Sequence, residues 1–225
     1  MINTGLRIYT HVTRAPAELV GAFKEIPVAN IGDNMNRRAC MSARIRPMNS
    51  SPLLGTAITV KTNPGDNLML YAAIDLAQPG DVIVVDAQGE LSNAITGELM
   101  LTWAQTKGLA GIVIDGAVRD AAAIVEMQMP VYAAGVTPNG PFKNGPGEVN
   151  ATISCGGVVV KPGDIVVGDA DGIVVIDPSD AKDVLEKSRA TVDKEAGIIA
   201  AIAQNAWDVS WVERVLKDKG CEFIR

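Results

Sequence analysis

An arginine and an aspartate stand side by side at positions 119 and 120, directly after a run that is typical of a buried strand. Ligands of open α/β sheets bind at the carboxyl ends of parallel strands, and this pair falls at such an end. Arg119 could hold a carboxylate or carbonyl oxygen through two hydrogen bonds, and Asp120 could hold a hard cation. A helix N-cap at Asp120, or an ordinary surface ion pair, would fit the same two residues.

A second segment with chemical potential opens the preceding predicted helix. Its residues are Gly97, Glu98, Leu99 and Met100. Backbone N–H groups at a helix start favour anions, and a glycine there lets a ligand approach the backbone. Taken alone, the segment also fits a plain helix start. Because strand-to-helix turns of neighbouring parallel strands share one edge of a sheet, we expect both segments to form one site.

The residue types restrict the metal that such a site could hold. His11 is the only histidine, and Cys40, Cys155 and Cys221 are too far apart to form a paired motif. A histidine zinc site is therefore excluded, and a cysteine–histidine or serine–histidine mechanism has little support. Oxygen ligands favour Mg²⁺ or Mn²⁺. A cation beside an arginine suits a 2-oxo acid, since both can stabilise an enolate.

The overall composition excludes several classes of function. The chain has 225 residues, 48% of them hydrophobic, 20% charged and 4% aromatic, with a net charge of −6. The acidic balance and the few aromatics argue against nucleic-acid binding. No apolar run is long enough to cross a membrane and the first residues do not resemble a signal peptide, so we expect a cytoplasmic protein.

The hydrophobic pattern predicts the elements that position these residues. Strands are predicted over residues 55–62, 82–86, 111–115 and 130–134, and helices over 66–77, 97–107 and 120–127. This alternation predicts a parallel βαβ core. A loop is expected to open at Gly89 and Glu90, directly after the strand that ends at Asp86.

The last third of the chain changes character. Short strands over 153–160, 164–167 and 172–176 are separated by turn residues, and helices follow over 178–205 and 210–219. The sequence therefore predicts an α/β fold, a layered β/β/α swivelling-type domain with antiparallel strands beside the parallel core. We expect one domain over 1–225, with a helical C-terminal extension from about 178 to 225.

Several runs resemble one known family. They are Gly97-Glu-Leu, Gly111-Ile-Val-Ile-Asp-Gly-Ala-Val-Arg-Asp120, the loop Gly140–Glu148, and the segment Cys155–Gly172. Together they are similar to the 4-hydroxy-4-methyl-2-oxoglutarate / 4-carboxy-4-hydroxy-2-oxoadipate aldolases, whose fold is shared with the regulator of ribonuclease activity A. The resemblance extends over roughly residues 17–225.

The resemblance implies a role for each site residue. Asp120 would be the metal ligand, Arg119 would bind the carbonyl and carboxylate of pyruvate, and residues 97–100 would offer backbone amides to that carboxylate. The family motif is an aspartate, twenty residues, then Arg-Asp, whereas this chain has Glu98 at the first position. The family also uses an acidic residue from a neighbouring subunit's C-terminal helix, for which Glu195 is the candidate. A solvated helix charge fits Glu195 equally well.

The reaction implied by the resemblance is a retro-aldol cleavage of 4-hydroxy-2-oxo diacids to pyruvate and a second 2-oxo acid. It would depend on Mg²⁺ or Mn²⁺ and run in a homotrimer or hexamer, and oxaloacetate decarboxylation would be a second activity.

Two rivals remain open. Ribonuclease-regulator relatives share the fold without catalysis, which would make this chain an interaction protein. A lyase that uses a Schiff-base lysine would need a lysine of lowered pKa, and Lys61 is the candidate. A dinucleotide-binding enzyme is disfavoured, because no glycine-rich motif opens a helix after the first strand.

Overall fold

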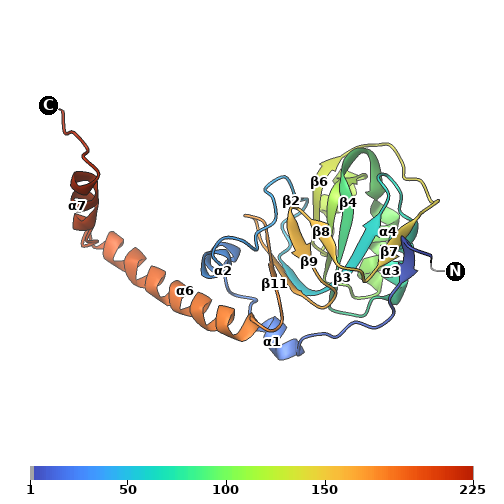
Figure 1. Cartoon of the computed structure of the whole chain (residues 1–225), viewed down its shortest axis with the longest axis horizontal. Helices are drawn as coiled ribbons and strands as arrows, with labels where there is room; N and C mark the ends of the chain where they lie inside the picture. The colour runs from blue at the N-terminus through green and yellow to red at the C-terminus, as the bar shows by residue number, and fades with distance from the viewer. Residues whose placement is uncertain (1–2, 225) are drawn as a thin grey trace. The chain divides into compact units, whose positions relative to one another are not determined.

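The protein is described by a computed structural model covering residues 3–224, and its main feature is a mixed sheet (Figure 1). The strands in that sheet are β1 (Leu6–Ile8), β2 (Arg46–Pro47), β3 (Leu53–Thr62), β4 (Asp81–Thr96), β5 (Gly111–Val118), β6 (Val131–Val136), β7 (Gly147–Val149), β10 (Ile165–Gly168) and β11 (Ile173–Ile176). Their order is β1-β7-β3-β4-β5-β6-β2, and β10 joins β3 to β11. The central strands β3, β4, β5 and β6 run parallel, as the sequence predicts.

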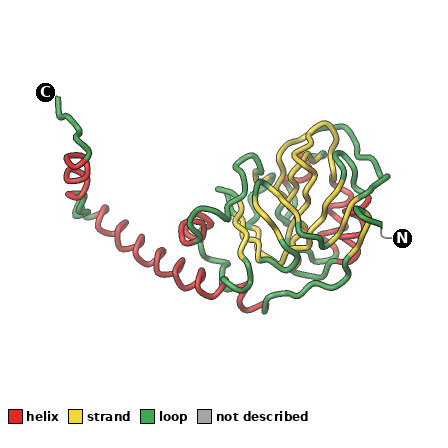
Figure 2. The backbone as a smooth tube through the Cα atoms, viewed as in Figure 1, coloured by secondary structure: helices red, strands yellow, loops and turns green. Residues whose placement is uncertain are grey.

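The helices of the described residues are α1 (Ala17–Gly21), α2 (Val28–Asn34), α3 (Leu68–Leu76), α4 (Glu98–Thr106), α5 (Ala121–Val125), α6 (Ala181–Ala203) and α7 (Ser210–Asp218). Of these, α3, α4 and α5 pack on one face of the sheet, and a hairpin packs on the other. The hairpin consists of β8 (Ile153–Cys155) and β9 (Val158–Val160). In Figure 2 the yellow strands lie together with short red helices beside them, which is the layered arrangement expected when βαβ units meet antiparallel strands.

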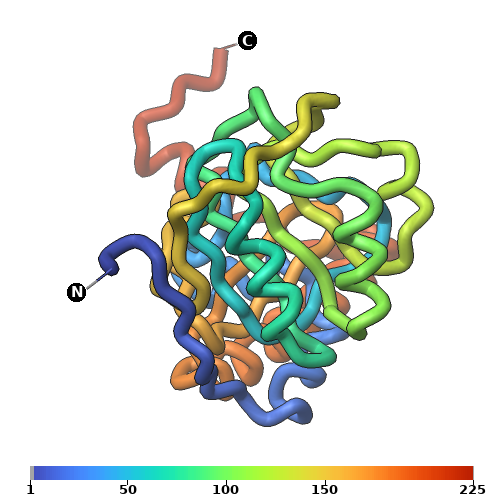
Figure 3. The backbone as a smooth tube through the Cα atoms, turned by 90° about the vertical axis from the view of Figure 1, so that its right-hand side faces the viewer, coloured from blue at the N-terminus to red at the C-terminus, as the bar shows by residue number. Residues whose placement is uncertain are grey.

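Two hydrophobic cores explain the layers. On one face, Ile58, Ile83 and Ile112 pack with side chains of α3, α4 and α5. On the other face, Val84 and Val113 pack with the β8–β9 hairpin and with β10 and β11. Figure 3 looks onto the helical face, where α3 and α4 contact one another. Strand segments buried on both faces need apolar residues, which is why residues 82–85 and 112–114 are apolar runs in the sequence.

The predicted fold class is confirmed, and the long strand β4 corrects one expectation. A loop from Gly89 was expected, but β4 runs on to Thr96 and still pairs with β5 there, through Thr96 and Val118. Register shifts follow Asp86, and the backbone has positive φ at Gln88 and Gly89. These irregularities bend the strand without ending it. Strand β4 therefore ends at Thr96, directly before Gly97 and the start of α4.

The hairpin corrects a second expectation. A single strand over 153–160 was predicted from the apolar run, but Gly156 and Gly157 have φ of 57° and 79° and turn the chain between β8 and β9. Two residues with positive φ make the tight turn that hairpins prefer. The short strands β1, β2 and β7 were not predicted, since two or three residues carry too little pattern.

The chain divides into two compact units, residues 1–188 and 189–225. The first holds the sheet, its cores and the start of α6, and the second holds the rest of α6 and α7. The predicted C-terminal helices are thus present, while a single domain over the whole chain stays a prediction. Among the described residues, no helix has both the length and the apolar character needed to span a membrane.

Candidate active site

The candidate site lies where β4 and β5 end beside the start of α4. Thr96 and Val118 pair at the ends of these strands, and Arg119 N donates to Thr96 O at 3.0 Å. Gly97 follows Thr96 and precedes α4, so the two segments singled out in the sequence meet. The parallel sheet brings them together because neighbouring strands end at one edge.

Gly97 is required by close packing at this edge. A Cβ at Gly97 would lie 2.3 Å from Asp120 Oδ2 and 2.7 Å from Arg119 Cγ. Real Cβ atoms do not approach that closely, so any other residue would displace both side chains. The glycine is therefore explained by the approach of Arg119 and Asp120 to the backbone.

The Asp120 carboxylate is turned towards α4. It precedes α5 in the left-handed conformation, with φ of 61°, and makes no side-chain cap bond to that helix. Instead Oδ2 accepts a hydrogen bond from Glu98 N at 3.0 Å and lies 3.5 Å from Arg119 Nε. Asp120 therefore occupies the N-cap position of α5, as one alternative predicted, but its side chain does not cap that helix. The ion pair with Arg119 is present but long. Both contacts use Oδ2, so within residues 3–224 Oδ1 remains available to a cation.

A cavity of about 290 Å³ opens beside these residues. That size suits a small-molecule ligand. Its lining residues are Asn67, Tyr71, Thr96, Gly97, Leu99, Met100, Arg119, Gly140, Pro141 and Lys143. Two of them, Arg119 and Lys143, are cationic and none is acidic. The charge of the lining therefore favours an anionic ligand.

Two polar atoms near the cavity lack partners. Asn67 and Thr96 are each 2% exposed, and among the described residues Asn67 Oδ1 and Thr96 Oγ1 have no hydrogen bond. The Asn67 amide nitrogen is fixed, because it donates to Ile95 O at 3.0 Å. Unsatisfied buried polar atoms are rare and call for an explanation, and a bound ligand or water would supply one.

Sequence reasoning missed Asn67, Tyr71, Thr96 and Lys143. Asn67 had a detectable signal, because it follows the predicted strand 55–62 and so reaches the same edge as Arg119. Lys143 had none, since only the tertiary structure places its loop here. Its ammonium lies 5.7 Å from the centre of the Tyr71 ring, a cation–π distance.

The remaining predicted residues separate into two groups. The N–H groups of Leu99 and Met100 precede the first intrahelical bond of α4, from Leu101 N to Gly97 O at 3.1 Å. The Glu98 N–H is instead used by Asp120. Glu195 lies on α6 in the second unit, and its part in a neighbouring subunit's site stays a prediction.

The donors at this edge fit one kind of metal. Among residues 3–224, no group of three or more His, Cys, Asp or Glu side chains could enclose an ion. Asp120 offers an available carboxylate oxygen at this edge. Such a sparse set of oxygen ligands suits Mg²⁺ or Mn²⁺, because Mg²⁺ keeps several waters in protein sites.

Lys61 does not support the Schiff-base alternative. It is exposed and pairs in register with Asp86 and Glu148, and it does not line the cavity. A lysine nucleophile needs desolvation or a cationic neighbour to lower its pKa, and Lys61 has neither burial nor a place at the cavity.

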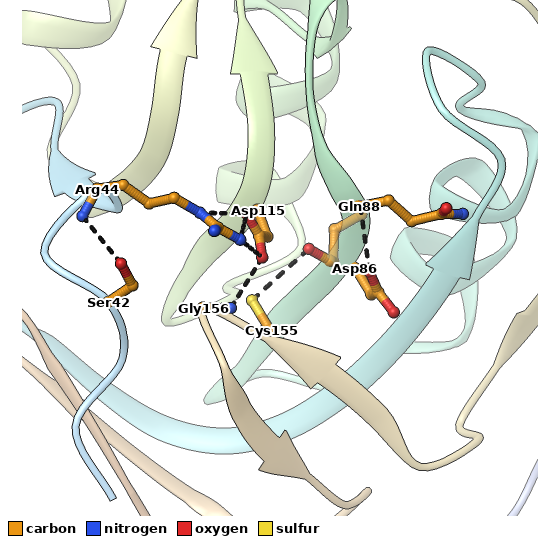
Figure 4. A network of polar contacts seen from close by, with 8 residues as sticks. Ser42, Arg44, Asp86, Gln88, Asp115, Cys155 and Gly156 are labelled. Atoms are coloured by element: carbon orange, nitrogen blue, oxygen red, sulfur yellow. Dashed lines mark hydrogen bonds and ion pairs between the residues drawn. The ribbon is translucent and has the colours of Figure 1, made fainter.

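A second polar cluster lies on the opposite face of the sheet (Figure 4). Arg44 binds Asp115 with both Nε and Nη2, at 2.5–3.1 Å, and Gly156 N donates to Asp115 at 2.9 Å. Burial raises the pKa of the Cys155 thiol and of the Asp86 carboxyl. A thiol held neutral is a poor nucleophile, so the cluster joins β5 to the β8–β9 hairpin rather than forming a reactive site.

Comparison with known proteins agrees with this architecture. A family model described as "RraA-like: Aldolase/RraA" matches residues 28–175, and the chain belongs to that family. A protein of Halalkalibacterium halodurans named "Putative 4-hydroxy-4-methyl-2-oxoglutarate aldolase" is 36% identical over 207 residues, which cover 91% of this chain and 99% of that protein.

Two solved structures share the fold and bear other names. Streptomyces coelicolor RraAS2, titled an unusual member of the RNase ES inhibitor RraA family, is 29% identical with a TM-score of 0.74, over 81% of this chain and 97% of that one. The RNA-processing inhibitor RraA from Thermus thermophilis is 27% identical with a TM-score of 0.63, over 68% of this chain and 93% of that one.

Proposed function

We propose that this chain is a divalent-metal-dependent aldolase that cleaves 4-hydroxy-2-oxo diacids to pyruvate and a second 2-oxo acid. One observation supports this most strongly. The cavity beside Asp120 is lined by two cations, Arg119 and Lys143, and by no acidic residue. A small dianion is the ligand that this charge distribution favours. The named aldolase among the relatives is consistent with that choice.

In this proposal each residue has a defined task. The amides of Leu99 and Met100, at the start of α4, bind the carboxylate next to the ketone. Arg119 donates hydrogen bonds to the ketone oxygen, where negative charge develops as the C3–C4 bond breaks. Lys143, which also lines the cavity, binds the second carboxylate and so selects diacids over monoacids.

Asp120 would hold the divalent cation, with Glu98 as the second carboxylate at the same edge. When bound, the cation would supply further positive charge to the ketone oxygen during enolate formation. Loss of carbon dioxide from oxaloacetate also leaves the enolate of pyruvate, so we propose oxaloacetate decarboxylation as a second activity. The proposal includes a homo-oligomer in the cytoplasm, with Glu195 reaching a neighbouring subunit's site.

Pyruvate release is the direct test. Purified protein would be assayed with 4-hydroxy-4-methyl-2-oxoglutarate and with oxaloacetate, with pyruvate consumption followed through lactate dehydrogenase, before and after EDTA treatment and on re-addition of Mg²⁺ or Mn²⁺. We expect turnover that the chelator removes and the metal restores. Asp75→Ala, which changes an exposed helix residue, serves as the matched control for Asp120→Ala. Turnover that survives both EDTA and Asp120→Ala would refute the proposal.

A non-catalytic interaction protein is the alternative, because one structural relative is titled an RNA-processing inhibitor and another an unusual member of the RNase ES inhibitor RraA family. The discriminating observation is whether an endoribonuclease is bound and inhibited. We expect no inhibition at protein concentrations that give full pyruvate release. Inhibition without any pyruvate release, unchanged in Asp120→Ala, would favour the alternative.

A further inference from the structure

Asp66 is a buried carboxylate whose contacts are all made to backbone near the cavity. The residue is 2% exposed. Its Oδ1 accepts from Leu68 N at 2.9 Å, and its Oδ2 accepts from Asn144 N at 2.5 Å and Gly145 N at 3.0 Å. One side chain therefore joins two segments that are far apart in the sequence.

The two oxygens of the Asp66 carboxylate bind different segments of the chain. Oδ1 holds the first residue of α3, and Oδ2 holds the loop that follows Lys143. Two backbone bonds reinforce the junction, from Asn67 N to Phe142 O at 3.0 Å and from Phe142 N to Gly65 O at 2.8 Å. The loop is thus fixed against the start of α3 on both sides of Lys143.

This junction determines where the Lys143 ammonium lies. Lys143 stands between Phe142 and Asn144, both of which are tied to the junction, and its ammonium rests 5.7 Å from the centre of the Tyr71 ring. Tyr71 belongs to α3, the helix whose start is held by Oδ1. Asp66 therefore sets the backbone of both partners of the contact that points Lys143 at the cavity.

We propose that Asp66 is a positioning residue, which fixes residues 142–145 against α3 and so places Lys143 to bind the second carboxylate of the substrate. The inference rests on the proposed function for the role of Lys143, but the anchoring of the loop does not. Asp66 touches no substrate atom in this proposal and acts through the loop.

Asp66→Asn is the sharpest substitution, because it keeps the shape of the side chain. Whichever way the new amide is oriented, an NH₂ group meets an N–H donor either from Leu68 or from Asn144 and Gly145. At least one of the two attachments is lost. The matched control is Asp164→Asn, since Asp164 is 5% exposed and accepts from Lys161 N at 2.8 Å in a turn that does not line the cavity.

The readout is the preference for a second carboxylate. kcat/KM would be measured for 4-hydroxy-2-oxoglutarate and for 4-hydroxy-2-oxopentanoate, in which a methyl group replaces that carboxylate. We expect Lys143→Met to reduce the preference for the diacid by about tenfold or more. Asp66→Asn should reduce it in the same direction, through KM rather than kcat, while cleavage of the monoacid changes little and Asp164→Asn leaves the ratio unchanged.

A double variant separates positioning from general damage. If Asp66 acts through Lys143, the pair Asp66→Asn/Lys143→Met should be no worse than Lys143→Met alone in its preference for the diacid. Additive losses, or an equal loss on both substrates in Asp66→Asn, would overturn the inference.

Amide hydrogen exchange keeps the test independent of turnover. Asp66→Asn should speed exchange over residues 142–145 relative to wild type and Asp164→Asn, whether or not the protein cleaves any substrate. Unchanged exchange there would refute the anchoring. Normal anchoring without pyruvate release from wild type would refute the proposed function instead.

Discussion

Two aspartates near the end of β5, Asp115 and Asp120, have opposite surroundings although each faces an arginine. The Asp115 side chain is 4% exposed and is bound by Arg44 through two nitrogens and by Gly156 N. The Asp120 side chain is 39% exposed, and its arginine is 3.5 Å away through one nitrogen. Asp115 lies within β5 and Asp120 lies two residues beyond its end, so the two differ mainly in how many hydrogen bonds each carboxylate accepts.

The comparison separates a structural carboxylate from an available one. Both oxygens of the Asp115 carboxylate accept hydrogen bonds, from Arg44 and Gly156 N, and join β5 to the hairpin and to the chain around Arg44 (Figure 4). Asp120 has one short hydrogen bond, to Glu98 N, and an available Oδ1 among the described residues. A buried, fully paired carboxylate stabilises the fold, whereas an underused one at a cavity can bind a ligand.

Removing either Arg119 or Asp120 should lower activity more than any other substitution considered below. Asp120→Ala and Arg119→Ala should each lower kcat/KM for pyruvate release by about 10²-fold or more, because each removes charge from the developing enolate. Neither should change the midpoint of thermal unfolding by more than a few degrees, since both side chains are about 40% exposed. Wild-type turnover in either variant would contradict the assignment of the site.

A smaller loss of activity should follow Gly97→Ala. The added Cβ would lie 2.3 Å from Asp120 Oδ2, so the carboxylate must move. Misplacement by about 1 Å can slow catalysis by about 10²-fold, and we expect a loss between tenfold and that value. Gly21→Ala, where the new Cβ has open space, is the control. Equal activity of the two variants would show that the close approach is unimportant.

Breaking the buried pair should affect stability rather than chemistry. Asp115→Asn removes the charge that binds Arg44 and should lower the free energy of unfolding by about 2 kcal/mol, with KM and kcat near wild type. Urea unfolding and the pyruvate assay, run on the same preparation, measure the two quantities. A catalytic defect with normal stability would reverse the roles assigned to Asp115 and Asp120.

Asp177, a partly exposed carboxylate, should have the smallest effect on stability. Lys161 and backbone and hydroxyl donors of Ser179 lower the pKa of Asp177 to about 2. The ionised Asp177 carboxylate therefore adds to the free energy of unfolding at pH values above the ordinary aspartate pKa. This stabilisation is lost as pH falls through about 2. Because both partners are exposed, we expect less than about 1 kcal/mol. In urea titrations, the wild type should lose this part of its free energy of unfolding between pH 4 and 2. The Asp177→Asn variant should already lack it at pH 5.

The outline of the fold follows from the sequence for a local reason. Residues 82–85 and 112–114 are apolar runs, and Gly108, with positive φ, lies two residues beyond the end of α4 at Thr106, so each leaves a mark in consecutive residues. The length of β4 was underestimated because Gly89 and Glu90 were predicted to open a loop, although pairing with β5 continues through Glu90 to Thr96. The residues of β5 that pair with the end of β4 lie more than twenty positions later in the sequence, so the pattern around Gly89 does not reveal them.

The candidate site divides in the same way. The amino-acid pattern alone was enough to predict that Arg119, Asp120 and residues 97–100 end or follow neighbouring strands, since parallel strands must share an edge. It contained no sign that the Asp120 carboxylate accepts from Glu98 N or that the Lys143 ammonium lies near the Tyr71 ring. Those contacts depend on side-chain directions and on the junction at Asp66, which form only when distant segments pack together.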